Sequence, residues 1–135
     1  MNNKGVCYIN TRFSFVTFKS GVTVINSTPH DITFMDIDGS IINVPSSCII
    51  NASVKETVVS KVAGVEYVKS EFVGSDEGAA LIEEIHKAYP SAVIIGSIIA
   101  AQAYPGLVVG MTPCKGFERV PPNEKRMSTV KFTVF

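Results

Sequence analysis

Short hydrophobic runs, separated by turn-forming residues, mark the first half of the chain. β-branched and aromatic residues dominate these runs, and several alternate with polar neighbours, which is typical of strands. Asp38-Gly39 separates two of the runs, and an Asp-Gly pair in that position is a strong hairpin signal. The pattern predicts an antiparallel meander with strands at 12–18, 22–25, 32–35, 41–44, 48–54 and 65–73.

The hydrophobic spacing changes after Gly74. Ser75 is a good N-cap, apolar positions then recur at helical intervals, and Pro90 stops the pattern. A fully apolar strand, a second short helix ended by Pro105-Gly106, and further strands follow. The second half therefore predicts helix 75–89, strand 92–95, helix 97–104, strand 107–111, a loop to Met127 and a closing strand over 130–135.

Together these elements predict an α+β (mixed α/β) fold. In this fold, N-terminal antiparallel strands precede a β-α-β-α-β unit and a closing C-terminal strand. With 135 residues and no linker or internal repeat, the chain is expected to be a single domain, 1–135. Helix 75–89, strand 92–95 and helix 97–104 are expected to form its scaffold.

Composition narrows the function classes. Twelve Lys and Arg balance twelve Asp and Glu, which argues against non-specific nucleic-acid binding. The longest apolar run, Ala92–Ala101, is broken by Gly96-Ser97 and is too short to cross a bilayer. The cysteines show neither disulfide nor metal-ligand spacing, so we expect reduced thiols in a cytoplasm, no metal site and no cofactor. These cysteines are Cys7, Cys48 and Cys114.

Charge is unevenly distributed along the chain. Acidic residues without a base among them lie between Glu71 and Glu84, whereas bases outnumber acids after Thr112. One interpretation pairs an acidic helix surface with a basic tail. The other makes the basic tail the rim of a site for an anionic ligand.

The junction Gly96-Ser97 is the first of three candidate ligand-contact segments. A strand that feeds a helix through a glycine turn leaves backbone N–H groups unpaired at the helix start, and an anion can bind there. Ser97 would contact such an anion through its hydroxyl. As an ordinary N-cap it would instead bond to its own helix, and no glycine-rich nucleotide motif surrounds it.

Two polar loops, 26–31 and 116–127, supply the other candidates. The first offers hydroxyl, imidazole and carboxylate groups, or else forms a turn that satisfies its own backbone. The second offers arginine forks for phosphate or carboxylate, or else pairs its bases with neighbouring acids. The candidate residues are Thr28, His30 and Asp31 in the first loop and Arg119, Lys125 and Arg126 in the second.

Other polar residues carry less specific signals. Asp36 and Asp38 would share one face of a strand and could bind a cation, or they sit in an exposed hairpin turn. Ser46 and Ser47 lack the surroundings of a nucleophile elbow, and Cys48 fits a small core residue. The sequence therefore predicts no catalytic residue.

Five segments of the chain support a family resemblance. They are VINSTPHDITF (24–34), VPSS (44–47), IIGSIIAAQAYPG (94–106), GFERVPPNEKRM (116–127) and KFTVF (131–135). On these segments the sequence resembles an uncharacterised family of small proteins from bacteria and bacteriophages, over residues 22–135. Ser27 departs from the leucine of that family. The resemblance implies that 1–21 is an N-terminal hairpin addition and that the setting is a phage or prophage; it carries no established activity.

We therefore expect a cytoplasmic module that binds a small anionic, nucleotide-like molecule between these three segments. In a phage it would act in the host cytoplasm and could sequester a host signalling nucleotide. The alternative is a structural or protein-interaction protein, a homo-oligomer whose Phe-rich N-terminal strands and terminal KFTVF strand pair between chains. A hydrolase or transferase using His30 as base is least favoured, because no nucleophile or metal set accompanies it.

Overall fold

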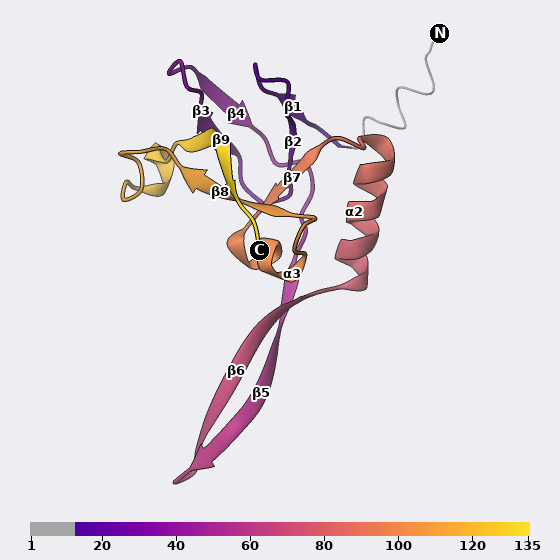
Figure 1. The fold of residues 1–135 in the computed structure, drawn as a ribbon, viewed down its shortest axis with the longest axis vertical. Helices are drawn as coiled ribbons and strands as arrows, with labels where there is room; N and C mark the ends of the chain where they lie inside the picture. The colour runs from indigo at the N-terminus through magenta and orange to yellow at the C-terminus, as the bar shows by residue number, and fades with distance from the viewer. Residues whose placement is uncertain (1–12) are drawn as a thin grey trace.

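The computed structural model describes residues 13–135. A seven-stranded sheet has the order β1-β2-β7-β8-β9-β3-β4, and a separate hairpin, β5-β6, projects from it (Figure 1). The strands are β1 (Val16–Thr17), β2 (Thr23–Asn26), β3 (Ile32–Met35), β4 (Ile41–Val44), β5 (Ala52–Val62), β6 (Val65–Gly74), β7 (Val93–Gly96), β8 (Val109–Pro113) and β9 (Met127–Thr133). The helices are α2 (Asp76–Ala88), α3 (Ile98–Ala103) and the 3-10 turn η1 (Pro122–Glu124). The fold is thus mixed, as predicted, with strands predominating.

The main sheet curls into a nearly closed barrel. Strands β2, β7 and β8 are parallel to one another, whereas β9 is antiparallel to β8 and parallel to β3. After β4 the chain returns to the end of β2. There the Ser47 N–H donates to the Asn26 carbonyl at 2.9 Å, and the Ile50 N–H donates to the Ser27 carbonyl at 3.1 Å. These bonds tie the segment after β4 to the end of β2, next to the other edge of the sheet.

Strand alternation divides the apolar side chains between two cores. Val24 and Ile95 lie in the first, with Phe18 and Phe34, whose ring centroids are 5.2 Å apart. Their neighbours Ile25 and Ile94 lie in the second, between the sheet and the two helices, with Ile82, Ile85, Tyr104 and Val108. Strand β7 is therefore buried on both faces, as its continuous apolar run predicts.

The scaffold predictions are confirmed. The predicted helix 75–89 is α2, which the Ser75 hydroxyl caps, and the predicted helix 97–104 is α3. The 36–39 segment forms the turn between β3 and β4, with Gly39 at φ +86°. The link from β7 through α3 to β8 is a parallel crossover.

The predicted antiparallel meander is confirmed only in part: β1-β2, β3-β4 and β5-β6 are antiparallel pairs, but the three pairs are not neighbours in one sheet. Residues 48–51 are not a strand, and β6 pairs with β5 alone, so it belongs to neither the meander nor the β-α-β-α-β unit. The closing strand β9 lies in the middle of the sheet between β8 and β3, so it is not an edge that could pair between chains. Of the predicted 12–18 strand, β1 remains, paired with β2; the part of the 1–21 addition before residue 13 lies outside the described residues.

In the described part of the chain, no helix is long and apolar enough to span a membrane.

Candidate functional site

Packing and capping account for Gly96-Ser97. The Ser97 hydroxyl accepts a hydrogen bond from the Ala100 N–H at 3.0 Å, so it caps α3. A Cβ on Gly96 would lie 2.8 Å from Val108 Cγ1 and 3.0 Å from Ser27 Oγ. Glycine is needed here because two neighbouring side chains pack directly against its backbone.

The loop after β2 is organised around the fully buried side chain of Asn26. Its Nδ2 donates to the carbonyls of His30 at 2.7 Å and Val44 at 3.1 Å. Its Oδ1 accepts from the Thr28 N–H at 2.9 Å, and the Thr28 hydroxyl lies 2.7 Å away. Thr28 thus serves the loop's own backbone, as the turn interpretation predicts. His30 and Asp31 are exposed, and the Asp31 carboxylate accepts from the Ser46 N–H at 3.3 Å.

The structure brings two of the three predicted ligand segments together. The Ser27 hydroxyl donates to the Ile95 carbonyl at 2.8 Å, which holds the loop containing Thr28 against the strand end at Gly96. In the third segment, Lys125 donates to the Glu118 carbonyl at 3.1 Å and Arg126 to the Lys125 carbonyl at 3.1 Å, while Arg119 is exposed. Within residues 13–135, no hydrogen bond or ion pair links this loop to Ser97 or His30, and the three-segment anion site stays a prediction.

Asp36 and Asp38 belong to the hairpin turn. Asp38 accepts from Lys19 Nζ at 2.5 Å and from Ser40, and these donors hold its pKa below the usual range. The Asp36 carboxylate accepts from the Thr129 hydroxyl at 2.9 Å. Among the described residues, no three His, Cys, Asp or Glu side chains gather as a metal site would require.

The feature that the sequence analysis missed is the β5-β6 hairpin, called the arm below. Its strands pair from Ala52↔Gly74 to Val62↔Val65, and nearly every side chain on them is exposed. At about 3.3 Å per residue, β5 extends roughly 36 Å. A two-stranded hairpin alone is at best marginally stable in water. Beyond its root, the arm is therefore a surface that no other part of residues 13–135 covers (Figure 1).

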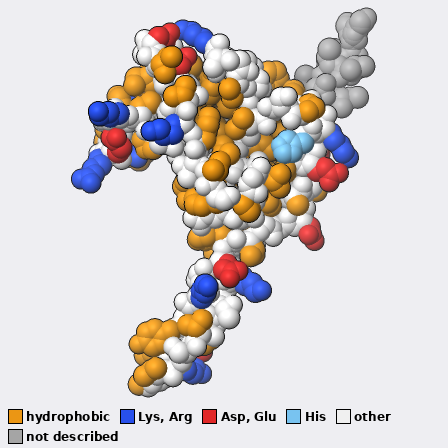
Figure 2. Space-filling view, viewed as in Figure 1, with side chains coloured by type: hydrophobic (Ala, Val, Ile, Leu, Met, Phe, Trp, Pro, Cys, Tyr) orange, Lys and Arg blue, Asp and Glu red, His pale blue; other side chains and the backbone are white. Residues whose placement is uncertain are grey.

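Apolar side chains on the arm form two clusters on opposite faces. Cross-strand partners share a face, so Val62, Val65 and Tyr67 form a tip cluster on one face. Val54, Val58, Val68 and Phe72 form a mid-arm cluster on the other. The register shifts between Val58 and Ser60, which makes Val59 an extra, bulged residue at the change of face. Figure 2 shows hydrophobic side chains gathered at the free end of the arm.

Tyr104, at the end of α3, anchors the root of the arm. Its hydroxyl accepts from the Ser75 N–H at 2.8 Å and donates to the Asn51 carbonyl at 3.1 Å. Its ring packs on Gly74 and Gly78, where an added Cβ would lie 2.4 Å from Cε1 and 2.0 Å from Oη, respectively. One buried side chain thus holds both strands where they leave the body. The cavity beside this root, of about 140 Å³, is lined by Ile49, Asn51, Ser75, Glu77, Gly78 and Leu81 and by none of the predicted ligand residues.

The arm turns through Ala63-Gly64, with φ of +52° and +79°. Two residues with positive φ are typical of a type I′ hairpin turn, for which Asn-Gly is preferred. Ala63 occupies the left-handed region at a cost of about 1 kcal/mol.

Ala63→Asn is expected to strengthen the arm because asparagine tolerates this conformation. Amide hydrogen exchange of the arm should slow about fivefold, corresponding to about 1 kcal/mol. The matched variant Ala63→Val should accelerate exchange, since a β-branched residue is disfavoured at positive φ. Equal exchange rates in the two variants would show that the turn does not limit opening of the arm.

A sequence signal for the arm does exist. Val62-Ala63-Gly64-Val65 lies between two segments in which valines are interspersed with lysine, glutamate and serine. Apolar residues occur on both faces and neither face is uniformly apolar, which is typical of a hairpin that packs against no core of its own chain.

In comparisons with known proteins, no family model, no curated protein and no solved structure matches this chain.

Proposed function

We propose that this protein is a structural assembly protein whose arm binds a neighbouring protein subunit. The observation that carries the proposal is the projection of paired strands whose tip and mid-arm valines are 41–59% exposed. Exposed apolar side chains gathered on one element mark protein interaction sites. This is the predicted alternative function, with a different element making the contact.

The charges of the arm favour a protein as the partner. Its three lysines and three glutamates cancel, so the arm offers no excess charge to a nucleic acid or to a small anion. Lys61 and Glu66 form an exposed ion pair with an N···O distance of 3.6 Å close to the turn. A neutral surface with apolar clusters fits another folded protein surface.

The test is the mass of the protein in solution, by light scattering after size-exclusion chromatography. The wild type is expected to run at a multiple of the chain mass. Val62→Lys combined with Val65→Glu places charges on the tip while keeping a cross-strand pair, and should weaken association about thirtyfold or more.

The matched control is Ile37→Lys with Ile41→Glu, which makes the same change at exposed positions of the β3-β4 hairpin. This control should associate as the wild type does. Two results would contradict the proposal. In the first, the purified wild type is monomeric, and in extracts of the native source the tip variant keeps every protein partner that the wild type binds. In the second, both double variants weaken association equally.

A further inference from the structure

We infer that the arm's partner is a second copy of this chain, with the two arms lying antiparallel about a two-fold axis. The tip cluster of each arm then contacts an apolar patch at the root of the other. This inference rests on the proposed assembly function and names its partner and contact surface.

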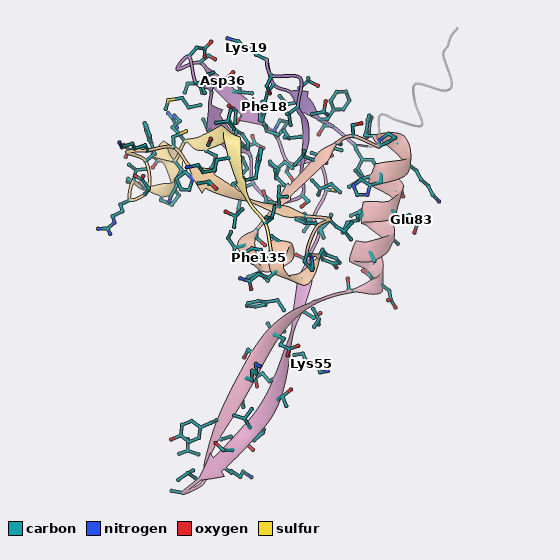
Figure 3. All side chains as sticks on the ribbon, viewed as in Figure 1. Phe18, Lys19, Asp36, Lys55, Glu83 and Phe135 are labelled. Atoms are coloured by element: carbon teal, nitrogen blue, oxygen red, sulfur yellow. The ribbon has the colours of Figure 1, made fainter. Side chains whose placement is uncertain are left out.

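The patch that would receive the tip lies on α3 and the end of the chain. Ile98 and Ile99 begin α3 and are each 44% exposed, and Val134 and Phe135 are 67% and 52% exposed. A Cβ on Gly110 would lie 2.6 Å from Ile98 Cδ1 and 3.5 Å from Thr133 Cβ. The last residues therefore leave β9 beside α3, where Figure 3 shows Phe135. These four residues are called the root patch.

The same helix places the root patch next to the arm. Tyr104, which follows α3, holds Asn51 and Ser75 at the two ends of the arm. When two arms of equal length lie antiparallel, each tip reaches the root of the other arm. A two-fold axis makes the two tip-to-root contacts identical, and the mid-arm clusters, on the opposite face of each arm, lie outside these contacts.

Area favours this reciprocal arrangement over a single contact. An exposed apolar cluster of this kind presents a few hundred Å² at most, whereas a stable interface buries about 800 Å² on each partner. One tip on one root patch is too small. In the reciprocal arrangement each copy buries both its tip cluster and its root patch, which together approach the required area, and the zero formal net charge of the chain adds no repulsion between copies.

Disulfide trapping between full-length chains tests the arrangement. In a background with Cys7, Cys48 and Cys114 replaced by alanine, Val62→Cys on one chain is mixed with Ile99→Cys on another and mildly oxidised. The background must first show the wild-type mass and a cooperative melting transition. The expected result is a mixed disulfide-linked dimer at several times the yield obtained with Ile37→Cys, whose site lies on the β3-β4 turn at the opposite end from the arm.

The outcomes separate the two proposals. Cross-linking of Val62→Cys to itself, with little to Ile99→Cys, places the tips together; it overturns the root-patch contact and leaves assembly by the arm standing. Association that depends on the tip but exceeds a dimer in mass overturns the two-fold arrangement. A wild type that is monomeric at every concentration tested overturns the proposal that the partner is a second copy. The assembly function is then decided by whether the tip variant fails to bind a different protein that the wild type binds.

Discussion

Replacing Asn26 by leucine is expected to lower the free energy of unfolding by about 4 kcal/mol, because buried polar groups lose their partners. The Thr28 N–H loses its acceptor and the Val44 carbonyl loses a donor, in a position with no exposed surface. The His30 carbonyl still accepts a hydrogen bond from the Thr28 hydroxyl, at 3.0 Å. Urea denaturation, monitored by circular dichroism, measures the change.

Asn43→Leu is the matched control, since Asn43 is an exposed asparagine on β4, next to Val44, whose carbonyl accepts from Asn26. Surface changes of this kind usually stay within about 0.5 kcal/mol. Similar losses at the two positions would contradict the role assigned to Asn26.

Asn26→Asp adds a pH signature to the same site. In this variant a carboxylate oxygen replaces Nδ2 and faces the carbonyl oxygens of His30 and Val44. Burial of the carboxylate and its repulsion by these oxygens should raise the folded-state pKa of the aspartate above its unfolded value near 3.9. The destabilisation should be complete at neutral pH and should shrink as the pH falls through that raised pKa, because the folded state takes up the proton first. A deficit independent of pH would show that the carboxylate escapes to solvent.

Gly78→Ala should destabilise the protein by about 3 kcal/mol, although alanine is favoured over glycine inside a helix by about 1 kcal/mol. The new methyl would lie 2.0 Å from Tyr104 Oη and 2.7 Å from Cζ. The buried ring would have to move, and its bonds to Ser75 and Asn51 at the root of the arm would break.

Ala79→Gly, one residue further on the exposed face of α2, should cost about 1 kcal/mol through helix propensity alone. Gly78→Ala and Ala79→Gly are opposite substitutions at adjacent positions, and both are thus expected to destabilise the protein. Tyr104→Phe should also reduce the additional cost of Gly78→Ala, since the closest atom is removed; strictly additive losses in this double-mutant cycle would rule out the contact. Thermal or urea unfolding of the four proteins supplies the comparison.

Local sequence signals specified most of the scaffold. Ser75 and Pro90 bound α2, Asp38-Gly39 turns between β3 and β4, and the apolar run around Ile94 forms a strand buried on both faces. Each of these features depends on residues close together in the chain, such as a cap, a turn pair or a short run. The strands of the arm also alternate, but alternation does not specify which strands a hairpin joins.

The candidate ligand residues divide along the same line. The sequence suggested both a capping role and a ligand role for Ser97, and both a turn role and a ligand role for Thr28. Their hydrogen bonds in the structure match the capping and turn roles. The sequence analysis assigned Gly96 to a turn that could bind an anion, whereas its small size is required by the side chains of Val108 and Ser27, which come from other strands and loops.

The sequence by itself placed α2, α3 and β7 to within one residue at each end, and it placed the β3-β4 turn, because caps, turn residues and hydrophobic period act over a few residues. Only the tertiary structure decided that β9 enters the middle of the sheet and that Tyr104 holds the root of the arm, since these depend on contacts between distant segments. Tertiary structure also decided that β5 and β6 leave the body, because a strand joins a sheet only when one face gains a core to cover. Among residues 13–135 the arm gains a core only at its root, where Phe72 and Val73 are half-buried, and that is why the tip cluster stays exposed.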